Sequence, residues 1–293
     1  MARVLLVCSF QPGGFGRLIY ATLLDMGINV MPFDNKAMVY RFGQRVMNRK
    51  LASYVEGWQP DTLFVFKGTG VNPDLIKKLK CDRKILWFPD EVYRYAFYEK
   101  LAKAFDQVYN FLDGCGVPML APGIYPPVHH EIKIPYEEKW KYDCDCVFVG
   151  TGHPRRRKQM RELLNGLKVK FKIWGNDWPA EFKAGKPQYY LNLSKAISGA
   201  KVVFNVHYAE HTPNQRCFEV TACKRLLISD TGTGLEKCFR KGKEYVAFEN
   251  IKEARELIEY YMENKKERRK IARAGYKRCM REHLLRMRLE EVI

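Results

Sequence analysis

The hydrophobic residues of this chain fall into short continuous runs, each followed by a segment with helical spacing. The first run, residues 4–7, has the unbroken apolar character of a parallel strand buried on both faces. Glycines interrupt the pattern before a helical segment at 18–24 and a second strand that begins at residue 28. Strands alternating with helices predict βαβ units with right-handed crossovers.

The alternation continues along the chain with one interruption. Before the interruption, the pattern predicts strands at 63–66 and 84–88 and helices at 73–79 and 92–105. After it, the pattern predicts strands at 146–149, 169–174, 201–206, 226–229 and 245–248, with helices at 156–167 and 216–223. The remainder, residues 251–293, is predicted to be almost wholly helical and is densely charged.

The interruption, residues 121–142, contains four prolines and no clean period, which is typical of a linker. A chain of 293 residues also exceeds the usual size of a single domain. We therefore predict an N-terminal domain at 1–125, a hinge at 126–142, a C-terminal domain at 143–275 and a final helix at 276–293. A ligand is expected where the carboxyl ends of the strands of both domains face one cleft.

Composition narrows the class of protein. A hydrophobic fraction of 46% and an aromatic fraction of 13% indicate a globular rather than a disordered chain. No segment approaches the about 20 apolar residues that span a bilayer, and the N-terminus lacks the features of a signal peptide. Nine cysteines without a C-x-x-C spacing favour reduced, buried thiols. We therefore expect a cytoplasmic protein, with any membrane contact peripheral.

The formal net charge of +18 predicts attraction to polyanions, namely nucleotide phosphates, nucleic acid or an anionic membrane face. A lysine-rich solubilising surface explains the same charge equally well. Basic residues are dense between 265 and 288, where they could bind anionic lipid or DNA. Interspersed glutamates also fit a solvated helix with i, i+4 ion pairs. The net charge by itself does not identify a binding partner.

The richest candidate chemistry follows the predicted strand that ends near residue 206. Thr212 and Pro213 have the pattern of a helix N-cap and a first-turn proline. Free backbone N–H groups at such a helix start attract phosphate, and Arg216 adds a guanidinium. Glu219, one turn on, could accept both ribose hydroxyls of a nucleotide. A surface helix with an Arg216–Glu219 pair is the plain alternative.

Two further glycine-rich turns join a strand to a predicted helix. One contains Thr231 and Gly232, and the other contains Gly150, Thr151 and Arg155. Such turns let a ligand approach the backbone closely. The second turn carries four cations at a helix N-terminus, where they oppose the helix dipole, so we expect an anion to compensate them. A solvated basic face is the alternative.

Five sequence motifs follow one another in the second half of the chain. They are FVGTGHPRRR, WGNDW, YYLNLSKAISGAKVVFNVHY, PNQRCFEVTACKRLLISDTGTGLEKCF, and KGKEYVAFENIKEARELIEYYMENKKERRKIARAGYKR. In this order they resemble the C-terminal domain of the CgeB-like (spore maturation protein) glycosyltransferases, over roughly residues 143–290. The segments PDTLFVFKG and KILWFPDE are similar to that family's first domain. The resemblance implies the α/β GT-B fold of the glycosyltransferase family 1/4 group, with two Rossmann-like domains facing a central cleft and a C-terminal helical tail that could cross back to the first domain.

The resemblance also implies a function. Such enzymes, hexosyltransferases among them, move a sugar from a nucleotide-diphospho-sugar, here a UDP- or GDP-sugar, to an acceptor hydroxyl, and no further cofactor is required. By position, Glu219 would hold the ribose, while Arg216 and the amides around Asn214 would hold the diphosphate. Gly150, Thr151 and Arg155 would line the donor cleft, and the turn with Thr231 and Gly232 joins the donor-binding candidates.

The sequence departs from that family where the sugar would bind. Related enzymes often carry a second glutamate eight residues before the ribose-binding one, whereas position 211 is histidine here with Glu210 beside it. We therefore take His211 as a candidate catalytic residue and Glu210 as a candidate cleft residue. The glycine common after the Ala-Cys of the helix is Lys224 here. The weak likeness to the E-x7-E group favours retention of the anomeric configuration.

In the first domain, Asp90 follows the strand at 84–88, where it could act as a general base or orient an acceptor hydroxyl. A helix N-cap is the alternative role for Asp90. Gly13 and Gly14 open the first helix at the same cleft edge, where they could allow close approach of donor or acceptor, although a tight turn explains them as well.

Two metal-like patterns are interpreted as structural. Asp143 and Asp145 form a D-x-D sequence, but they precede their strand at the end remote from the expected cleft, so no required metal follows. His129 and His130 have no Cys or His at ligand spacing, which favours a hinge or packing role.

Two alternatives stay open beside a glycosyltransferase with a glycan or protein acceptor. One is a DNA-modifying glycosyltransferase that acts on a hydroxylated base, for which the +18 charge would be the DNA footprint. The other is a non-catalytic nucleotide- or sugar-binding protein on the same fold. A dehydrogenase is disfavoured because Q-P-G-G-F-G after the first strand is not G-x-G-x-x-G in the right register.

Overall fold

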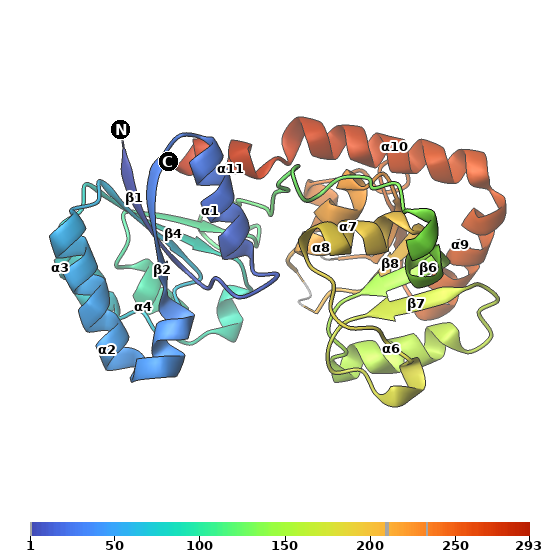
Figure 1. The fold of residues 1–293 in the computed structure, drawn as a ribbon, viewed down its shortest axis with the longest axis horizontal. Helices are drawn as coiled ribbons and strands as arrows, with labels where there is room; N and C mark the ends of the chain where they lie inside the picture. The colour runs from blue at the N-terminus through green and yellow to red at the C-terminus, as the bar shows by residue number, and fades with distance from the viewer. Residues whose placement is uncertain (1, 209–210, 233) are drawn as a thin grey trace. The chain divides into compact units, whose positions relative to one another are not determined.

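The computed structural model describes residues 2–208, 211–232 and 234–293. The chain divides into two compact units, Met1–Pro122 with Leu285–Ile293, and Gly123–Leu284. Each unit contains one five-stranded, all-parallel sheet with helices around it (Figure 1). The predicted α/β class with two Rossmann-like domains is confirmed.

The first unit is built on the strand order β2-β1-β3-β4-β5. Its strands are β1 (Arg3–Cys8), β2 (Asn29–Asp34), β3 (Thr62–Phe66), β4 (Arg83–Phe88) and β5 (Gln107–Asn110). Its helices are α1 (Phe15–Asp25), α2 (Asn35–Trp58), α3 (Pro73–Lys78), the 3₁₀ turn η1 (Val92–Arg94), α4 (Tyr98–Ala102) and α11 (Leu285–Val292). The last of these, α11, packs against α1 although it is far from it in sequence.

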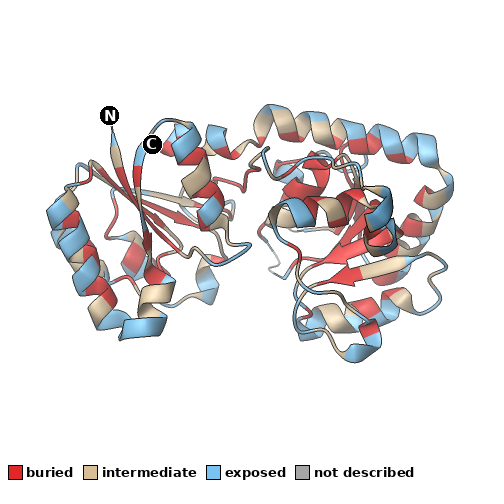
Figure 2. Ribbon diagram, viewed as in Figure 1, coloured by how far each residue is buried: buried red, intermediate tan, exposed pale blue. Residues whose placement is uncertain are grey.

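Burial explains the unbroken apolar runs of this unit. Helices α2, α3 and α4 contribute to a core against one face of the sheet, and α1 lies on the other face. Strand β1 is therefore covered on both sides, and its residues 4–8 have no exposed surface. Figure 2 shows the same pattern, with buried residues concentrated in the strands and exposed residues on the outer helix faces.

The second unit repeats this topology. Its strands are β6 (Cys144–Val149), β7 (Phe171–Trp174), β8 (Ala200–Asn205), β9 (Leu226–Asp230) and β10 (Val246–Phe248), in the order β10-β9-β8-β6-β7. Counted from the first strand of each unit, the two orders are the same. Its helical segments are η2 (Tyr136–Glu138), α5 (Lys139–Tyr142), α6 (Pro154–Leu164), η3 (Ala180–Phe182), α7 (Tyr190–Ser198), α8 (Gln215–Ala222), η4 (Leu235–Lys237), α9 (Ile251–Glu263) and α10 (Lys265–Glu282).

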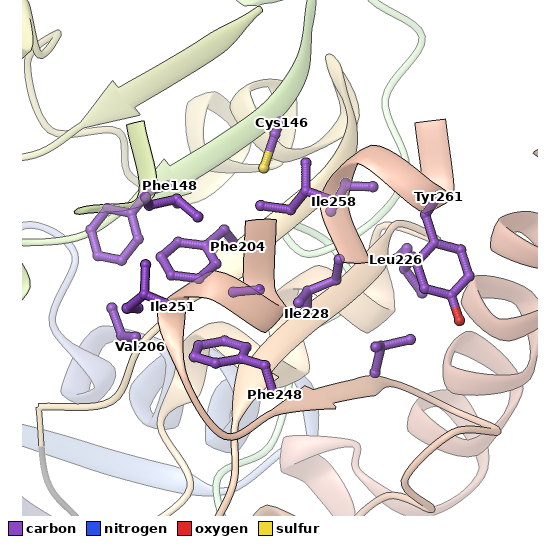
Figure 3. Packing of buried hydrophobic residues seen from close by; sticks show 14 of the residues in the cluster. Cys146, Phe148, Phe204, Val206, Leu226, Ile228, Phe248, Ile251, Ile258 and Tyr261 are labelled. Carbon is purple, nitrogen blue, oxygen red and sulfur yellow. The ribbon is translucent and has the colours of Figure 1, made fainter. Parts of the chain in front are cut away.

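A cluster of buried aromatic and aliphatic side chains packs against one face of this second sheet (Figure 3). Phe204 on β8 stacks on Phe248 with ring centroids 5.4 Å apart, and Phe148 on β6 lies beside Phe204. Helix α9 adds Ile251, Ala254, Ile258 and Tyr261 to the same cluster. Because these side chains come from every third or fourth position of α9, the amphipathic pattern of that helix fixes which side faces the sheet.

One predicted helix of the first unit is wrong. The helix expected at 92–105 is two short pieces, η1 and α4, separated by residues 95–97. Tyr95, Phe97 and Tyr98 all pack around Phe88, with ring centroids 5.4, 6.1 and 4.8 Å from it. Side chains at i and i+2 point to opposite sides of a helix, so this aromatic packing breaks the helix.

The pattern also failed to predict α2, α7 and β5. Helix α2 is 24 residues long but buries few apolar side chains, chiefly Met47, Leu51 and Val55 along one narrow stripe. It is also bent at Gly43, whose φ of 78° is not helical. A long polar helix with one apolar residue per turn gives little periodic signal in the sequence.

All nine cysteines are free thiols, and seven of them are buried, as the sequence predicts. None of the helices in the described ranges is both long enough and apolar enough to cross a bilayer.

We predict that Gly16→Ala destabilises the first unit by about 1–3 kcal/mol. An added Cβ at this position would lie 2.5 Å from the Ser9 carbonyl oxygen, because α1 starts directly against the end of β1. The matched control is Gly57→Ala in α2, where a Cβ meets nothing within 4 Å. That change should stabilise by about 0.5–1 kcal/mol. Urea unfolding of the two variants tests this difference, and equal effects would contradict the packing described.

Candidate functional site

The sheet topology directs attention to one place in each unit. In this strand order, the connections from the first and third strands leave on opposite faces of the sheet, so a crevice opens between their carboxyl ends. In the first unit these ends are Cys8 on β1 and Phe66 on β3. In the second unit they are Val149 on β6 and Asn205 on β8.

Two arginines bind the strand ends at the crevice of the second unit. Arg216 Nε donates to the Val149 carbonyl oxygen at 3.1 Å. Arg156 donates from Nε and Nη2 to the Val206 carbonyl oxygen, at 3.1 and 2.9 Å, and also from Nη1 to the Thr151 carbonyl oxygen at 3.3 Å. A guanidinium is therefore fixed at the end of each of the two strands.

The two guanidinium groups influence each other. Burial lowers the pKa of Arg156 to about 10, and the charge of Arg216 also lowers it, while Asp230 acts in the opposite direction. Two cations therefore lie near each other at one sheet edge, with the carboxylates of Glu219 and Asp230 beside them.

Helix α8 begins at this same edge. Its N-cap is Asn214, whose Oδ1 accepts from the Cys217 N–H at 3.3 Å and whose Nδ2 donates to Asn205 Oδ1 at 3.2 Å. The prediction of Thr212 as N-cap with Pro213 in the first turn is wrong, because both residues precede the cap and are buried. Asparagine caps as well as threonine does, and here it is also anchored to β8.

Glu219 lies one turn into α8 and is only 6% exposed. Arg216 Nη1 donates to Glu219 Oε2, so the predicted i, i+3 pair exists, but it is buried rather than on a surface helix. Burial raises the pKa of Glu219, and the charge and hydrogen bond of Arg216 oppose that shift. The carboxylate is thus held in place in a poorly solvated setting.

His129 completes this group from the predicted hinge segment, where a hinge or packing role was expected. It is 2% exposed, and its Nδ1 accepts from the Tyr125 N–H at 3.1 Å. Burial lowers the pKa of His129 to about 3, with further contributions from the charges of Arg216 and His130. The ring is therefore neutral with its proton on Nε2, which lies 3.4 Å from Glu219 Oε1.

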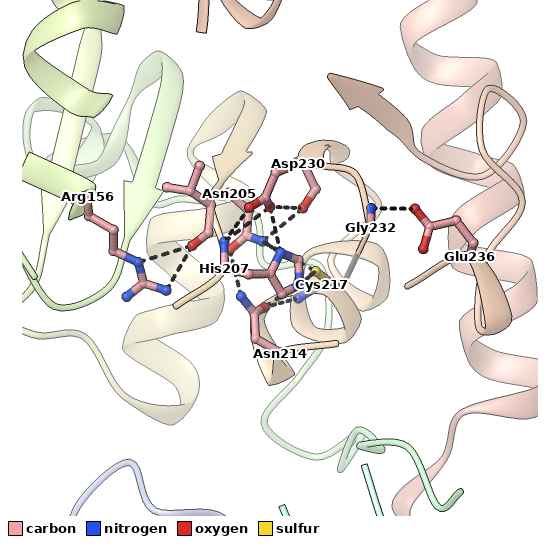
Figure 4. A network of polar contacts seen from close by, with 10 residues as sticks. Arg156, Asn205, His207, Asn214, Cys217, Asp230, Gly232 and Glu236 are labelled. Atoms are coloured by element: carbon pink, nitrogen blue, oxygen red, sulfur yellow. Dashed lines mark hydrogen bonds and ion pairs between the residues drawn. The ribbon is translucent and has the colours of Figure 1, made fainter. Parts of the chain in front are cut away.

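A second polar network ties together the loops that follow β8 and β9 (Figure 4). His207 is 2% exposed, and its Nδ1 lies 2.6 Å from Asp230 Oδ1. The His207 N–H donates to the same carboxylate at 3.0 Å. Asn205 Nδ2 donates to Ser229 Oγ at 3.0 Å. His207 and Asp230 were not among the predicted site residues, although both stand where a buried strand ends.

The glycine turn after β6 does not present its amides as expected. The N–H groups of Gly150 and Gly152 donate to the carbonyl oxygens of Trp174 and Asn176, at 2.8 and 2.9 Å. Arg157 binds the Gly152 and Asp177 carbonyl oxygens. Arg156 and Arg157 thus both bind backbone carbonyl oxygens, and the anion expected at the start of α6 stays a prediction.

The other donor-binding candidates on this turn are solvent-exposed. Thr151 and Arg155 are both exposed, and Arg155 stands in the first turn of α6.

The glycine turn after β9 differs from the prediction as well. Among the described residues between β9 and β10 there is no α-helix, only the three-residue 3₁₀ turn η4. Gly232 has a φ of 73°, and its N–H donates to Glu236 Oε1 at 3.3 Å, while the Thr231 N–H donates to the Phe248 carbonyl oxygen at 3.2 Å. A short turn with positive φ stands here in place of a helix. The Gly232 N–H already donates to the Glu236 carboxylate.

His211 is exposed in the loop that leads from β8 to α8. Glu210, the other candidate near the sugar, lies outside the described residues.

The crevice of the first unit contains a cavity of about 530 Å³. Gly13 and Gly14 line it, together with Lys67 and Tyr95. Lys67 Nζ lies 2.5 Å from Asp90 Oδ2 and donates to the Tyr95 hydroxyl at 3.3 Å. Burial lowers the pKa of Lys67, but the hydrogen bond and charge of Asp90 outweigh this, so the net shift is upward.

Asp90 does not cap a helix. The N-cap of η1 is Glu91, and Asp90 instead pairs with Lys67 at the end of the neighbouring strand. Lys67 was not predicted, although it follows β3 as Asp90 follows β4. The cavity also contains unsatisfied polar groups: among the described residues, Ser9 Oγ and Asn35 Oδ1 have no hydrogen-bond partner. Such groups suit a ligand with hydroxyls.

The D-x-D sequence is engaged in contacts within the second unit. Asp145 accepts from the Lys170 N–H at 2.9 Å and pairs with Lys201 at 2.6 Å, near the amino end of β6. Within the described ranges, no three His, Cys, Asp or Glu side chains gather as metal ligands would.

Comparison with known proteins identifies the architecture. Sucrose-phosphate synthase from Thermosynechococcus elongatus superposes with a TM-score of 0.76 at 11% identity, covering 99% of this chain and 97% of that one. HepE from Anabaena, solved with UDP-glucose, gives 0.70 at 10% identity, with 99% and 98% covered. AviGT4, a glycosyltransferase involved in avilamycin A biosynthesis, gives 0.65 at 11% identity, with 99% and 96% covered. The chain has the GT-B fold.

Sequence comparison gives a match in the second half of the chain. Residues 155–293 match a protein family described as glycosyl transferase-like. No curated protein matches the chain by sequence. The narrower resemblance to CgeB-like enzymes stays a prediction.

We predict that His129 makes this GT-B protein less stable in acid. A histidine whose pKa is lowered from 6.5 to about 3 on folding contributes fully above pH 6.5, and this contribution is lost as the pH falls towards 3. The loss should be about 1.4 kcal/mol per pH unit. His129→Gln keeps an N–H donor for Glu219 but does not titrate, so its free energy of unfolding should fall less steeply. Equal slopes in urea titrations from pH 6 downwards would contradict this assignment.

Proposed function

We propose that this GT-B protein is a glycosyltransferase that binds a nucleotide-diphospho-sugar in its second unit and transfers the sugar to an acceptor hydroxyl. The observation that carries the proposal is the buried Glu219, held by Arg216 and His129 at the topological switch point of the sheet. A desolvated carboxylate beside fixed cations matches a ligand with a diol at one end and a diphosphate at the other.

Similarity to other proteins supports the proposed glycosyltransferase function. The glycosyl transferase-like family covers the part of the chain that contains α8. HepE, which shares the fold, is described in complexes with UDP and with UDP-glucose. We therefore propose a UDP- or GDP-hexose as the donor.

The donor would use the groups in the second unit as follows. Each Glu219 oxygen has one protein partner, which leaves a lone pair on each for the ribose hydroxyls. Arg216 and Arg156 would face the diphosphate, with the first amides of α8 behind Asn214. Because these fixed cations can stabilise charge on the leaving diphosphate, we propose transfer without a metal. Gly150, Thr151, Arg155, Thr231 and Gly232 remain proposed donor-side residues.

The acceptor would bind in the cavity of the first unit. Its lining combines the aromatic side chains of Phe66 and Tyr95 with Lys67 and Ser9, and Lys67 in turn pairs with Asp90. Such a mixture suits a sugar, which has apolar ring faces and many hydroxyls. Asp90 would take the proton of the attacking hydroxyl or orient it, with Lys67 holding the carboxylate.

The sugar end of the donor is proposed from position alone. His211 stands where related enzymes carry a glutamate, and Glu210 is its neighbour in sequence. We propose that this loop contacts the transferred sugar and that the configuration is retained.

Glu219→Gln should weaken UDP-glucose binding about tenfold to a hundredfold, because a charge-assisted hydrogen bond contributes about 1.5–3 kcal/mol. Isothermal titration calorimetry on the full chain measures this. The matched control is Glu256→Gln, the same change at an exposed position of α9. If wild-type protein binds neither UDP- nor GDP-sugars, the proposed function is wrong. Equal affinity in the two variants would instead exclude Glu219 as the ribose ligand.

Asp90→Asn should lower kcat by about 10²–10⁴-fold, the range for loss of a general base, while donor affinity stays unchanged. Release of UDP in the presence of a sugar acceptor measures the rate. Asp82→Asn, at an exposed position of the same unit, serves as the control. A kcat for Asp90→Asn that matches the control would remove Asp90 from the mechanism.

A further inference from the structure

A large hollow lies on the second unit at the edge of the sheet opposite to the proposed donor site. Its volume is about 750 Å³, and its lining includes Ala200 and Leu226, the first residues of β8 and β9. Cations project from two sides, Lys201, Lys224 and Arg225 from the strand side and Arg269, Arg273 and Lys277 from α10. We call it the basic hollow.

The cations of the strand side already have partners. Lys201 pairs with Asp145 at 2.6 Å, and Arg225 pairs with Glu131 at 2.7 Å. Lys224 lies over the Tyr276 ring, 4.5 Å from its centroid. The structure thus accounts for these charges by contacts within the unit.

The three cations of α10 are different. Within the described part of the chain, no carboxylate lies at ion-pair distance from Arg269, Arg273 or Lys277, and all three are exposed. They are spaced four residues apart, so they form one row along the helix, where like charges at i and i+4 repel one another. The same row also lines a second hollow of about 520 Å³ with Lys266 and Lys270. Helix stability therefore does not explain this row, whereas a bound anion would relieve the repulsion.

The shape and surroundings of the basic hollow indicate the class of anion. A helix that lies on a membrane needs an exposed apolar face, but the apolar residues of α10, such as Ile271, Ala272 and Cys279, are buried in the unit. Single-stranded nucleic acid needs exposed aromatic rings for base stacking, and the one ring here, Tyr276, lies under Lys224. Cations around a concave site suit a compact, multiply charged ligand.

We propose that the basic hollow binds a compact ligand with two or more phosphate groups, held by Arg269, Arg273 and Lys277. Phosphate oxygens would accept from the two guanidinium forks and the ammonium group. Because the hollow lies at the amino ends of β8 and β9, it is separate from the edge that carries Arg216 and Glu219. The proposal therefore does not depend on glycosyl transfer.

Calorimetric titration of the full chain with inorganic tripolyphosphate tests this. Wild-type protein should bind, and the double variant Arg269→Ala/Arg273→Ala should bind about tenfold more weakly or not at all. The matched control, Lys252→Ala/Lys265→Ala, removes the same charge from exposed positions of α9 and α10 that line neither hollow. It should bind as the wild type does. Circular dichroism melting of both variants checks that they are folded.

Further measurements distinguish the basic hollow from the donor site and test other sources of phosphate. Saturating UDP fills the proposed donor site, and the binding of tripolyphosphate that needs Arg269 and Arg273 should persist in its presence. Loss of all tripolyphosphate binding with UDP would place the anion in the donor site alone and overturn the proposal. Phosphatidylcholine vesicles with phosphatidylinositol bisphosphate test the same phosphate chemistry on a lipid, and binding that needs Arg269 and Arg273 would support the proposal.

Two other results would contradict the proposal. Equal weakening of tripolyphosphate binding in the control variant would show a diffuse charge effect. Binding of a DNA duplex but not of tripolyphosphate would mark a nucleic-acid surface. Either of these last results overturns the proposal.

Discussion

The buried contact between Glu219, Arg216 and His129 is the interaction on which the second unit's site depends. Arg216 joins the end of β6 to α8 through the Val149 carbonyl oxygen, and the same guanidinium neutralises Glu219. Without that cation, a carboxylate with 6% exposure would carry the full cost of desolvation. The neutral His129 supplies an N–H to the other oxygen without adding charge. The arrangement leaves a preorganised acceptor for hydroxyl groups beside a fixed cation.

The two units show how one topology can support two kinds of site. Both sheets have the same strand order and open a crevice at the same place. In the second unit, two arginines bind the strand ends beside the carboxylates of Glu219 and Asp230. In the first unit, the corresponding place holds the Lys67–Asp90 ion pair among aromatic side chains. The fold therefore sets the positions, while the residues after each strand set the chemistry.

Much of the fold could be predicted from the sequence, because buried parallel strands consist of continuous apolar runs. Arg216 and Glu219 were readable for a similar reason, since a spacing of three residues places them on one side of a helix. His129 was not, because its partner is 90 positions away and nothing local marks a buried histidine as a hydrogen-bond donor to a distant carboxylate. The Asn214 cap was missed because Thr212 fits the local rule equally well, and only the anchor on Asn205 decides between them. Lys67 and Asp230 did carry a signal, as polar residues directly after buried strands.

A crystal structure of the protein with UDP is the measurement that tests the central claim most directly. The account predicts that the two ribose hydroxyls contact the Glu219 carboxylate and that the diphosphate lies against Arg216 at the start of α8. A nucleotide bound elsewhere, with Glu219 still enclosed by Arg216 and His129 and out of contact with it, would contradict the account.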